Sequence, residues 1–225
     1  MIPRRYQRIR QMLARRQPDL TVLTEDVHKP HNFSAIIRTC DAVGVFKVHA
    51  VNVTAAMPTF SPVAQGSEKW VLRQTHPDIE SAIATLQAQN FRVYAAHLSE
   101  QAQDYSTVDY TQPTAILMGA EKWGVSTTAA AKADGHVIIP MLGMVESLNV
   151  SVAAATILFE AQRQRLAAGM YERDCIDQNL RDRLLFEWGY PKLANIYRQR
   201  GEPYPNLGEN GEILGSASRS IEQSN

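Results

Sequence analysis

Three short segments that join expected strands to helices carry polar side chains that could take part in chemistry. Residues 31–39 carry Asn32 and Arg38, residues 117–125 carry Glu121, and residues 139–153 carry Ser147 and Asn149 at an expected helix start. Amide, hydroxyl and carboxylate groups can orient an oxygen through hydrogen bonds. A guanidinium group stays protonated, so Arg38 offers positive charge rather than a base. Each residue also has an ordinary structural alternative, since Asn caps helices and charged side chains are usually solvated.

The segment 139–153 has the features of a small-molecule site. A strand is expected to stop at Pro140, a flexible loop follows around Gly143, and a helix starts near Asn149 with exposed backbone N–H donors. Gly119, at the end of another expected strand, lets the backbone approach a ligand. An apolar rim suited to an adenine or thioether is formed by Met141, Leu142, Met144 and Leu148. The structural alternative is a capped helix with an apolar entry loop.

Several common catalytic motifs are absent from the sequence. It contains no Gly-x-Gly, Walker A lysine loop, His-Glu-x-x-His or Gly-x-Ser-x-Gly. His28 and His31 form one weak pair, so no metal is expected. Kinases, NAD(P)-dependent oxidoreductases, metalloproteases and α/β-hydrolases therefore lose their main support. A cofactor without a phosphate remains compatible with the sequence.

Short apolar strands alternate with helices along the chain, which predicts an α/β domain with a largely parallel sheet. Strands are expected at 20–27, 47–51, 70–74, 91–98, 114–118 and 136–140. Helices are expected at 3–16, from Asn32 or Ser34 to 44, at 78–90, at 126–133, from 149 to 165, at 177–188 and at 191–200. An irregular stretch contains Pro58 and Pro62.

The balanced total charge hides an uneven distribution. The 225 residues include 23 Lys and Arg against 23 Asp and Glu. Residues 1–18 nevertheless carry six Arg and no acid, and residues 163–200 have a net charge of +3. Basic ends around an acidic middle suit a polyanion, although such runs are often only solvated surface. Two Cys, no long apolar run and no secretory signal make a cytosolic protein the default.

In this order, residues 31–39, 117–125 and 139–153 resemble the signature motifs of the SpoU RNA 2′-O-methyltransferases of the SPOUT superfamily. The motifs are Asn-x-x-Ala-Ile-x-Arg-Thr, Gly-x-Glu-x-x-Gly-Val and Ile-Pro-Met-x-Gly-x-x-x-Ser-Leu-Asn-Val-Ser-Val-Ala. The resemblance covers about residues 20–165, with Ser34 where many members have Gly. Segments 12–20, 28–32, 160–165 and 184–191 resemble the branch of the family that methylates guanosine 18 of tRNA.

The resemblance implies a SPOUT-type α/β fold, with a mostly parallel sheet, a C-terminal trefoil knot and helical extensions at both ends. The expected divisions are a basic N-terminal extension at 1–19, a methyltransferase domain at 20–165, a C-terminal helical extension at 166–203 and a mobile tail at 204–225. The resemblance also implies S-adenosylmethionine as cofactor, tRNA as partner and a homodimer. A cytoplasmic location is expected. DNA and membranes are not expected partners.

The resemblance also assigns residues to roles. The catalytic set is Arg38, Asn32, Glu121, Ser147 and Asn149. The cofactor set is Ala96, His97, Leu98, Leu117, Gly119, Ile139, Met141, Gly143 and Leu148. The tRNA-binding set comes from the Arg-rich ends of the chain, with His31 added: Arg4, Arg5, Arg8, Arg15, Arg16, His31, Arg163, Arg165 and Arg173. No metal ligands are implied.

The implied reaction is attack of a ribose 2′-hydroxyl on the methyl group of a sulfonium. The hydroxyl is a weak nucleophile, so it needs a base or a strongly orienting environment. The family's proposed base matches Arg38, acting with substrate phosphate in its own chain or from the neighbouring protomer. Guanidinium chemistry favours the interpretation that Arg38 orients the 2′-oxygen and stabilises developing negative charge.

Three alternatives remain at this point. One is a ribosomal-RNA 2′-O-methyltransferase of the same family, although such enzymes often carry a separate N-terminal RNA-binding domain for which residues 1–19 leave no room. Another is a catalytically inactive SPOUT-like RNA-binding module, which the intact polar motif residues disfavour. The third is a small-molecule enzyme with an α/β fold, which the Arg-rich ends disfavour.

Overall fold

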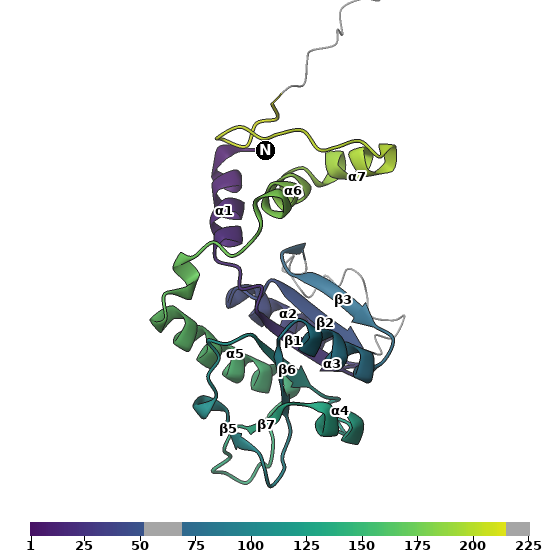
Figure 1. The fold of residues 1–225 in the computed structure, drawn as a ribbon, viewed down its shortest axis with the longest axis vertical. Coiled ribbons are helices and arrows are strands. Elements are labelled where there is room, and N and C mark those ends of the chain that lie inside the picture. Colours follow the sequence, from purple (N-terminus) through teal and green to yellow (C-terminus); the bar gives the residue numbers. More distant parts are fainter. Residues whose placement is uncertain (52–68, 215–225) are drawn as a thin grey trace, which may run out of the picture. The chain divides into compact units, whose positions relative to one another are not determined.

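The computed structural model describes residues 1–51 and 69–214, which divide into two compact units (Figure 1). Unit 1 joins the two ends of the chain, Met1–Arg15 and the described part of Asp174–Asn225. Unit 2 is the segment Arg16–Arg173, apart from residues 52–68. The expected irregular stretch around Pro58 and Pro62 lies outside the described residues.

Unit 2 is built on a parallel sheet, whose described strands lie in the order β3-β2-β1-β6-β4-β7-β5. From β1 the chain adds β2 and β3 on one side, and β6, β4, β7 and β5 lie on the other. Open α/β sheets bind ligands beyond the carboxyl ends of their strands near such a reversal. The strands are β1 (Leu20–Glu25), β2 (Lys47–Val51), β3 (Leu72–His76), β4 (Arg92–Ala96), β5 (Gln103–Asp104), β6 (Thr114–Met118) and β7 (Gly135–Ile138).

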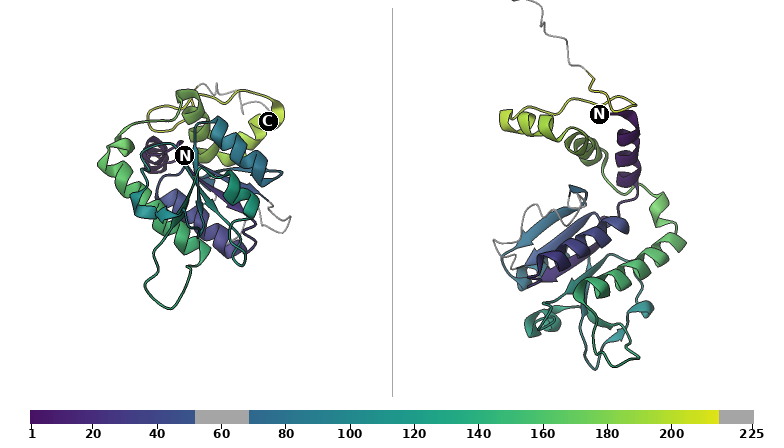
Figure 2. Two further views of the ribbon diagram at one scale, coloured as in Figure 1. Left: turned by 60° about the horizontal axis from the view of Figure 1, so that its bottom comes forward. Right: turned by 180° about the vertical axis from the view of Figure 1, so that it is seen from behind.

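Helices cover both faces of this sheet (Figure 2). α2 (Pro30–Ala42) and α5 (Val150–Ala167) pack on one face through side chains such as Ile36 and Ile157. α3 (Ile79–Ala88) and α4 (Thr127–Lys132) pack on the other. The described part of this unit also contains the short 3₁₀ helices η3 (Tyr105–Thr107) and η4 (Met170–Glu172). The predicted α/β class and parallel sheet are confirmed, and the trefoil knot stays a prediction.

The sequence-based element assignments hold for most of the chain. The predicted strands at 47–51 and 114–118 have the observed bounds. The strand expected at 70–74 lies two residues later, at Leu72–His76. β5 was not predicted, because its two residues, Gln103 and Asp104, give neither apolar alternation nor length. Short edge strands of this kind depend on pairing with a neighbour, here β7.

Side-chain caps define several of the helix starts. Asp78 accepts a hydrogen bond of 2.7 Å from the Ser81 N–H, and Asn149 accepts one of 2.9 Å from the Ser151 N–H. The expectation that Asn32 or Ser34 caps α2 is wrong. The N-cap position is Lys29, which makes no side-chain cap, and Pro30 opens the helix.

Two fully buried arginines stabilise unit 2 from within. Arg165 is 0% exposed, and Arg16 is also 0% exposed and is ion-paired with Asp41. Arg16 also donates to the carbonyl oxygens of Val45 and Trp70. Arg165 donates to Asp19 Oδ1 at 2.5 Å, to Gln17 Oε1 at 3.1 Å and to the carbonyl oxygens of Asp19, Tyr110 and Gln112. Such multiply bonded guanidinium groups are the usual form of a buried cation.

Unit 1 is helical. Its core is formed by α1 (Pro3–Ala14), α6 (Gln178–Gly189) and α7 (Pro191–Arg200), and Phe186 stacks on Tyr204 with ring centroids 4.7 Å apart. The backbone of the last described segment also contacts this unit, because Tyr190 Oη donates to the Gly211 carbonyl oxygen at 2.8 Å. The part of the predicted tail at 215–225 lies outside the described residues.

Two further observations concern the described residues only. None of their helices is both long and apolar enough to cross a membrane. Nor do they contain a group of three or more His, Cys, Asp or Glu side chains that could hold a metal ion.

Candidate active site

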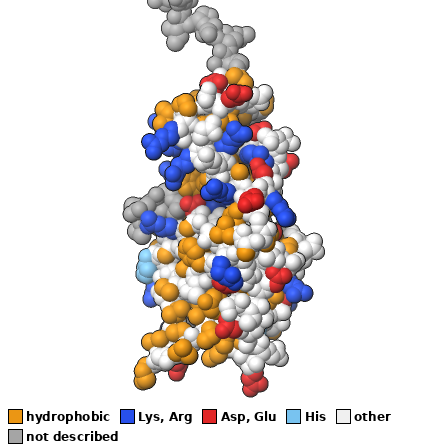
Figure 3. All heavy atoms as spheres, turned by 90° about the vertical axis from the view of Figure 1, so that its left-hand side faces the viewer, with side chains coloured by type: hydrophobic (Ala, Val, Ile, Leu, Met, Phe, Trp, Pro, Cys, Tyr) orange, Lys and Arg blue, Asp and Glu red, His pale blue; other side chains and the backbone are white. Residues whose placement is uncertain are grey.

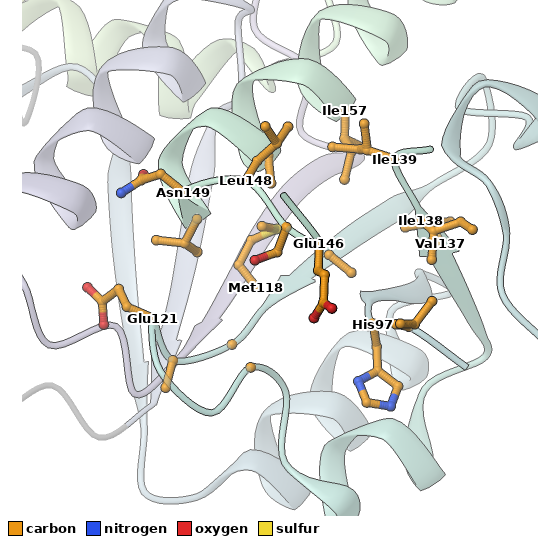
Figure 4. A pocket seen from close by; sticks show the side chains of 18 of the residues that line it. His97, Met118, Glu121, Val137, Ile138, Ile139, Glu146, Leu148, Asn149 and Ile157 are labelled. Carbon is orange, nitrogen blue, oxygen red and sulfur yellow. The ribbon is translucent and has the colours of Figure 1, made fainter. Parts of the chain in front are cut away.

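A cavity of about 730 Å³ opens at the carboxyl ends of β4, β6 and β7 (Figure 4). These strands are neighbours in the sheet, so the loops that follow them meet at one edge. The start of α5 closes another side through Val150, Ala153 and Ile157. The volume lies within the range of about 300–1,000 Å³ that is typical of small-molecule sites.

Most of the predicted cofactor residues line this cavity: Ala96, His97, Leu98, Gly119, Ile139, Met141 and Leu148. Leu117 does not line it, because its side chain is fully buried in the core on the α3 face of the sheet. The neighbouring Met118 lines the cavity instead, since successive side chains of a strand point to opposite faces. Gly143 also lies outside the lining.

Three of the predicted catalytic residues come from different segments and are joined by hydrogen bonds. Asn32 is 2% exposed, and its side-chain Nδ2 donates to Glu121 Oε1 at 2.9 Å. The Asn149 Nδ2 donates to Asn32 Oδ1 at 3.2 Å. Asn149 then accepts from the Ser151 backbone N–H and hydroxyl. Asn32, in the first motif, therefore bonds to Glu121 of the second motif and to Asn149 of the third. These bonds hold the three motifs together at the edge of the cavity.

Glu121 is held as a carboxylate by this arrangement. Partial burial raises its pKa, but hydrogen bonds from Asn32 and from the backbone N–H groups of Lys29 and His28 together keep the pKa below its ordinary value. The N–H groups belong to the chain entering α2, so the charge also lies favourably at the start of that helix. Glu121 thus anchors the loop after β6 to α2.

The loop after β6 has a fixed shape. The backbone groups of Ala120 and Gly124 exchange two hydrogen bonds, of 2.9 Å and 2.8 Å. A Cβ atom on Gly119 would lie 2.1 Å from the carbonyl carbon of Gly124, so this position requires glycine. Gly124 itself has a φ of +69°, in the left-handed region. The close approach at Gly119 is between two parts of the loop itself. The predicted approach of this backbone to a ligand stays a prediction.

Ser147 lines the cavity together with Glu146, which sequence reasoning missed. In Figure 4 the Glu146 side chain points into the cavity, and Glu121 and Asn149 lie on the opposite side from Ile138 and Ile139. The sequence signal that could have identified Glu146 was its position within the third motif. A carboxylate there adds negative charge to a lining that also contains the polar side chains of His97, Glu121 and Asn149.

A second polar group borders the cavity at His97. His97 packs edge-on against His136, with ring centroids 5.2 Å apart. Partial burial, and then the proximity of His136, lower the pKa of His97, which favours the neutral ring at neutral pH. His136 is fixed in turn by Ser99 Oγ at 2.7 Å from Nδ1 and by the Ala130 carbonyl oxygen at 2.9 Å from Nε2.

Arg38 is not part of the cavity lining of its own chain. It lies on an exposed face of α2, six residues and about 9 Å along the helix axis from Asn32. His31, in the first turn of the same helix, is also exposed. Both side chains are therefore accessible to a large ligand at the α2 side of unit 2.

The predicted tRNA-binding arginines fall into two groups. The exposed ones are Arg4, Arg5, Arg8 and Arg15 in unit 1, and Arg163 and Arg173 in unit 2. Arg16 and Arg165 are fully buried and bonded within unit 2, so the prediction that they contact phosphate is wrong. Their place in Arg-rich segments concealed a structural role, because a buried arginine and a surface arginine look alike in a sequence.

The cavity fits a cofactor such as S-adenosylmethionine, which has an aromatic base, a positively charged sulfonium and no phosphate. Met118, Ile139 and Leu148 offer apolar contacts for the base, and the backbone around Gly119 offers hydrogen-bonding groups. Glu146 offers a carboxylate to a cationic group. No phosphate-binding loop is needed, in agreement with its absence from the sequence.

Comparisons with known proteins agree with this geometry. The profile of the SpoU rRNA methylase family matches residues 19–159, and that of the SpoU rRNA methylase C-terminal family matches residues 163–216. A tRNA (guanosine(18)-2′-O)-methyltransferase of Escherichia coli is 55% identical over 219 residues, 96% of each chain. A protein of the same name from Thermus thermophilus is 61% identical over 184 residues, 82% of this chain and 95% of its own.

Solved structures show the same similarity. A TrmH/SpoU tRNA-modifying enzyme of A. aeolicus matches with a TM-score of 0.79 and 39% identity, covering 84% of this chain and 97% of that one. The SpoU methyltransferase AviRb of Streptomyces viridochromogenes, in complex with the cofactor AdoMet, matches with a TM-score of 0.60 and 28% identity over 67% of this chain and 62% of that one.

Proposed function

The chain belongs to the SpoU rRNA methylase family, and we propose that it transfers a methyl group from S-adenosylmethionine to the ribose 2′-hydroxyl of guanosine 18 in the D-loop of tRNA. The observation that carries this proposal is the hydrogen-bonded set Glu121–Asn32–Asn149 at the edge of the cavity. It brings three separate motifs together at one site. The relatives with high identity over most of the chain act on tRNA, which favours tRNA over ribosomal RNA.

The bound cofactor would supply an electrophilic methyl group, and residues of this chain would hold it in the cavity. Apolar side chains such as Ile139 and Leu148 would exclude water from the transfer. Asn32 and Glu121 would keep the loop after β6 and the start of α2 in fixed positions. Ser147 would then offer its hydroxyl to the substrate side of the cavity. This arrangement accelerates transfer chiefly by placing the reacting atoms in line.

Arg38 would orient the 2′-oxygen and the adjacent phosphate of the RNA. A guanidinium group binds phosphate well and does not lose its proton near neutral pH, so it stabilises negative charge that develops on the attacking oxygen. The pH–rate profile of Arg38→Lys distinguishes this role from that of a literal base. A lower rate with an unchanged profile supports orientation, and a profile that follows the lysine pKa contradicts it.

The exposed arginines of unit 1 would contact tRNA phosphates. Figure 3 shows Lys and Arg side chains spread over the α1 side of this unit. Such contacts position an RNA without reading its sequence. The acceptor is a 2′-hydroxyl, which DNA lacks, so the substrate is RNA. A cytoplasmic location would agree with a tRNA substrate.

The enzyme would work as a homodimer through an apolar stripe on α5. Val152, Phe159 and Leu166 are 49%, 51% and 56% exposed, and their spacing of seven residues aligns them along one side of the helix. Figure 3 shows hydrophobic side chains gathered on this side of unit 2. A second copy of the chain would cover the stripe. Sedimentation should then give a dimer for the wild type and a monomer for Phe159→Glu, and a monomeric wild type would contradict the proposal.

The decisive experiment is methyl transfer from labelled S-adenosylmethionine to unmodified tRNA transcripts, followed by mapping of the modified ribose. Label at guanosine 18 is expected. Label at another tRNA ribose would retain the family activity and remove the assignment to position 18. No transfer to any RNA would instead favour an inactive RNA-binding module.

A further inference from the structure

The side chain of Trp123 lies exposed at the cavity. It is 79% exposed, although tryptophan usually buries most of its large apolar surface. It lines the same cavity as Glu121 and Asn149. An aromatic ring left in solvent beside a binding site is a common feature of surfaces that recognise a ligand.

The backbone that carries Trp123 is fixed on both sides. The Ala120–Gly124 hydrogen bonds close the loop around it, and Glu121 is tied to α2. After the loop, Val125 is buried and the Ser126 N–H and hydroxyl donate to the buried carboxylate of Glu25 at 3.0 and 2.7 Å. The ring is therefore presented by a loop whose shape is set before any ligand arrives, which reduces the entropy lost on binding.

The charge beside the ring suits a nucleotide. The Lys122 ammonium lies over one face of the Trp123 ring, 4.5 Å from its centre, which leaves the opposite face for a stacked base. An aromatic ring offers a stacking surface to any base, and a neighbouring ammonium attracts the phosphate of the same nucleotide. The position of the ring at the proposed methyl-transfer cavity favours a nucleotide over a peptide or a lipid.

We propose that Trp123 stacks on the base of the nucleotide whose 2′-hydroxyl receives the methyl group. This inference rests on the proposed function. In the proposed function the ribose would enter at the side of the cavity that Glu121 and Asn149 line. Trp123 lines the same cavity, so the attached base would lie beside its ring. When the base leaves the RNA loop, it loses the stacking interactions with its neighbouring bases. Stacking on the Trp123 ring would replace those interactions.

The test compares two tRNA transcripts that differ only in the base at the acceptor position. One carries guanosine, and the other carries an abasic ribonucleotide that keeps its 2′-hydroxyl. Wild type, Trp123→Phe and Trp123→Leu are assayed on both by single-turnover methyl transfer. Binding of S-adenosylmethionine to each variant is measured by calorimetry in the absence of RNA.

On the guanosine transcript, Trp123→Leu should lower kcat/KM by about 5-fold to 150-fold, the factor expected for loss of one base–aromatic stack, and Trp123→Phe by less. On the abasic transcript, Trp123→Leu should cause no loss relative to the wild type. Cofactor affinity should be the same in all three proteins.

Equal losses on both transcripts, or weakened cofactor binding, would overturn the stacking role and make Trp123 a part of the loop or of the cofactor site. Full activity of Trp123→Leu on guanosine would also overturn it. Failure of the proposed function is recognised separately, because the wild type would then not methylate the guanosine transcript at all.

Discussion

The side-chain amide of Asn32 donates a hydrogen bond of 2.9 Å to the carboxylate of Glu121. The two residues are 89 positions apart, one in the first turn of α2 and one in the loop after β6. Because Asn32 also accepts from Asn149, a single buried side chain fixes the relative positions of the elements around the cavity.

Asn32→Ala should lower kcat/KM for tRNA methylation by about 10-fold to 150-fold, which corresponds to a lost hydrogen bond to a charged group. The reason is that Glu121 and Asn149 lose the partner they share. Single-turnover methylation of a tRNA transcript measures the effect. Asn195→Ala, a change at an exposed position of α7, is the control and should retain wild-type activity. Wild-type activity of Asn32→Ala would show that the link is dispensable.

The contribution of Glu121 to stability should depend on pH. Its pKa is below its ordinary value in the folded protein, so the unfolded chain binds the proton first as the pH falls. The stabilisation is therefore complete above the ordinary Glu pKa and is lost as the pH falls through the lowered one. Urea unfolding of wild type and Glu121→Gln at a series of pH values should show their difference decreasing in acid. A difference that is constant with pH would contradict the assignment.

Arg163 and Arg165 lie in the same turn of α5 and differ in burial, so their variants can be compared directly. Arg165 is fully buried, so Arg165→Met should lower the free energy of unfolding by about 3–5 kcal/mol, as expected when one partner of a buried ion pair is removed. The Arg163 side chain is 68% exposed and pairs with Glu160 at the surface. Arg163→Met should change stability by less than about 0.5 kcal/mol and weaken tRNA binding instead. Urea unfolding and filter binding separate the two outcomes, and equal stability of both variants would refute the distinction.

His49 should make the protein less stable in weak acid. It is 2% exposed, and its Nδ1 lies 2.9 Å from Nε2 of His76. Burial first, and then the proximity of His76 and Lys47, lower its pKa from 6.5 to about 4. Between these two pH values only the unfolded state gains the proton. The free energy of unfolding therefore decreases as the pH is lowered, by about 3 kcal/mol in total for this group. His49→Asn should flatten this part of the stability–pH curve, whereas an unchanged slope would assign it to other groups.

The exposed arginines of α1 should give tRNA binding a steep dependence on salt. Each phosphate contact adds about 0.7 to 0.9 to the slope of log affinity against log salt concentration. The double variant Arg4→Ala/Arg8→Ala should therefore reduce that slope by about 1.4 to 1.8. Arg92→Ala removes an exposed charge outside the proposed surface and is the control. A slope unaffected by the double variant would place the tRNA elsewhere.

Local sequence signals predicted most of the fold but not which side chains turn inward. Apolar runs located the strands, and Asp78 and Asn149 marked helix starts, because both signals act over a few residues. Leu117 was assigned to the cavity in place of Met118, since the face of a buried strand depends on the layers packed against it. A strand apolar on both sides gives no alternation from which to read that choice.

Long-range hydrogen bonding was equally hidden. The partners of Asn32 are 89 and 117 residues away, so no local rule distinguishes its observed role from that of a helix cap. Arg16 and Arg165 were placed among phosphate ligands for the same reason, because their carbonyl and carboxylate partners come from distant loops. The motif resemblance located the site. The structure was needed to distinguish the residues that are open to a ligand from the buried residues that hold them in position.

Helix α5 is fixed at both of its ends. It begins at Asn149, which bonds to Asn32 at the cavity, and its last turn carries Arg165, held by five acceptors at the opposite edge of the sheet. Its 18 residues span about 27 Å. Axial sliding or rotation of the helix would break bonds at both ends at once. The position of the Asn149 amide is therefore set in part by the buried guanidinium group of Arg165, which no substrate reaches. Loss of the Arg165 bonds would misalign the reacting atoms at the other end of the helix.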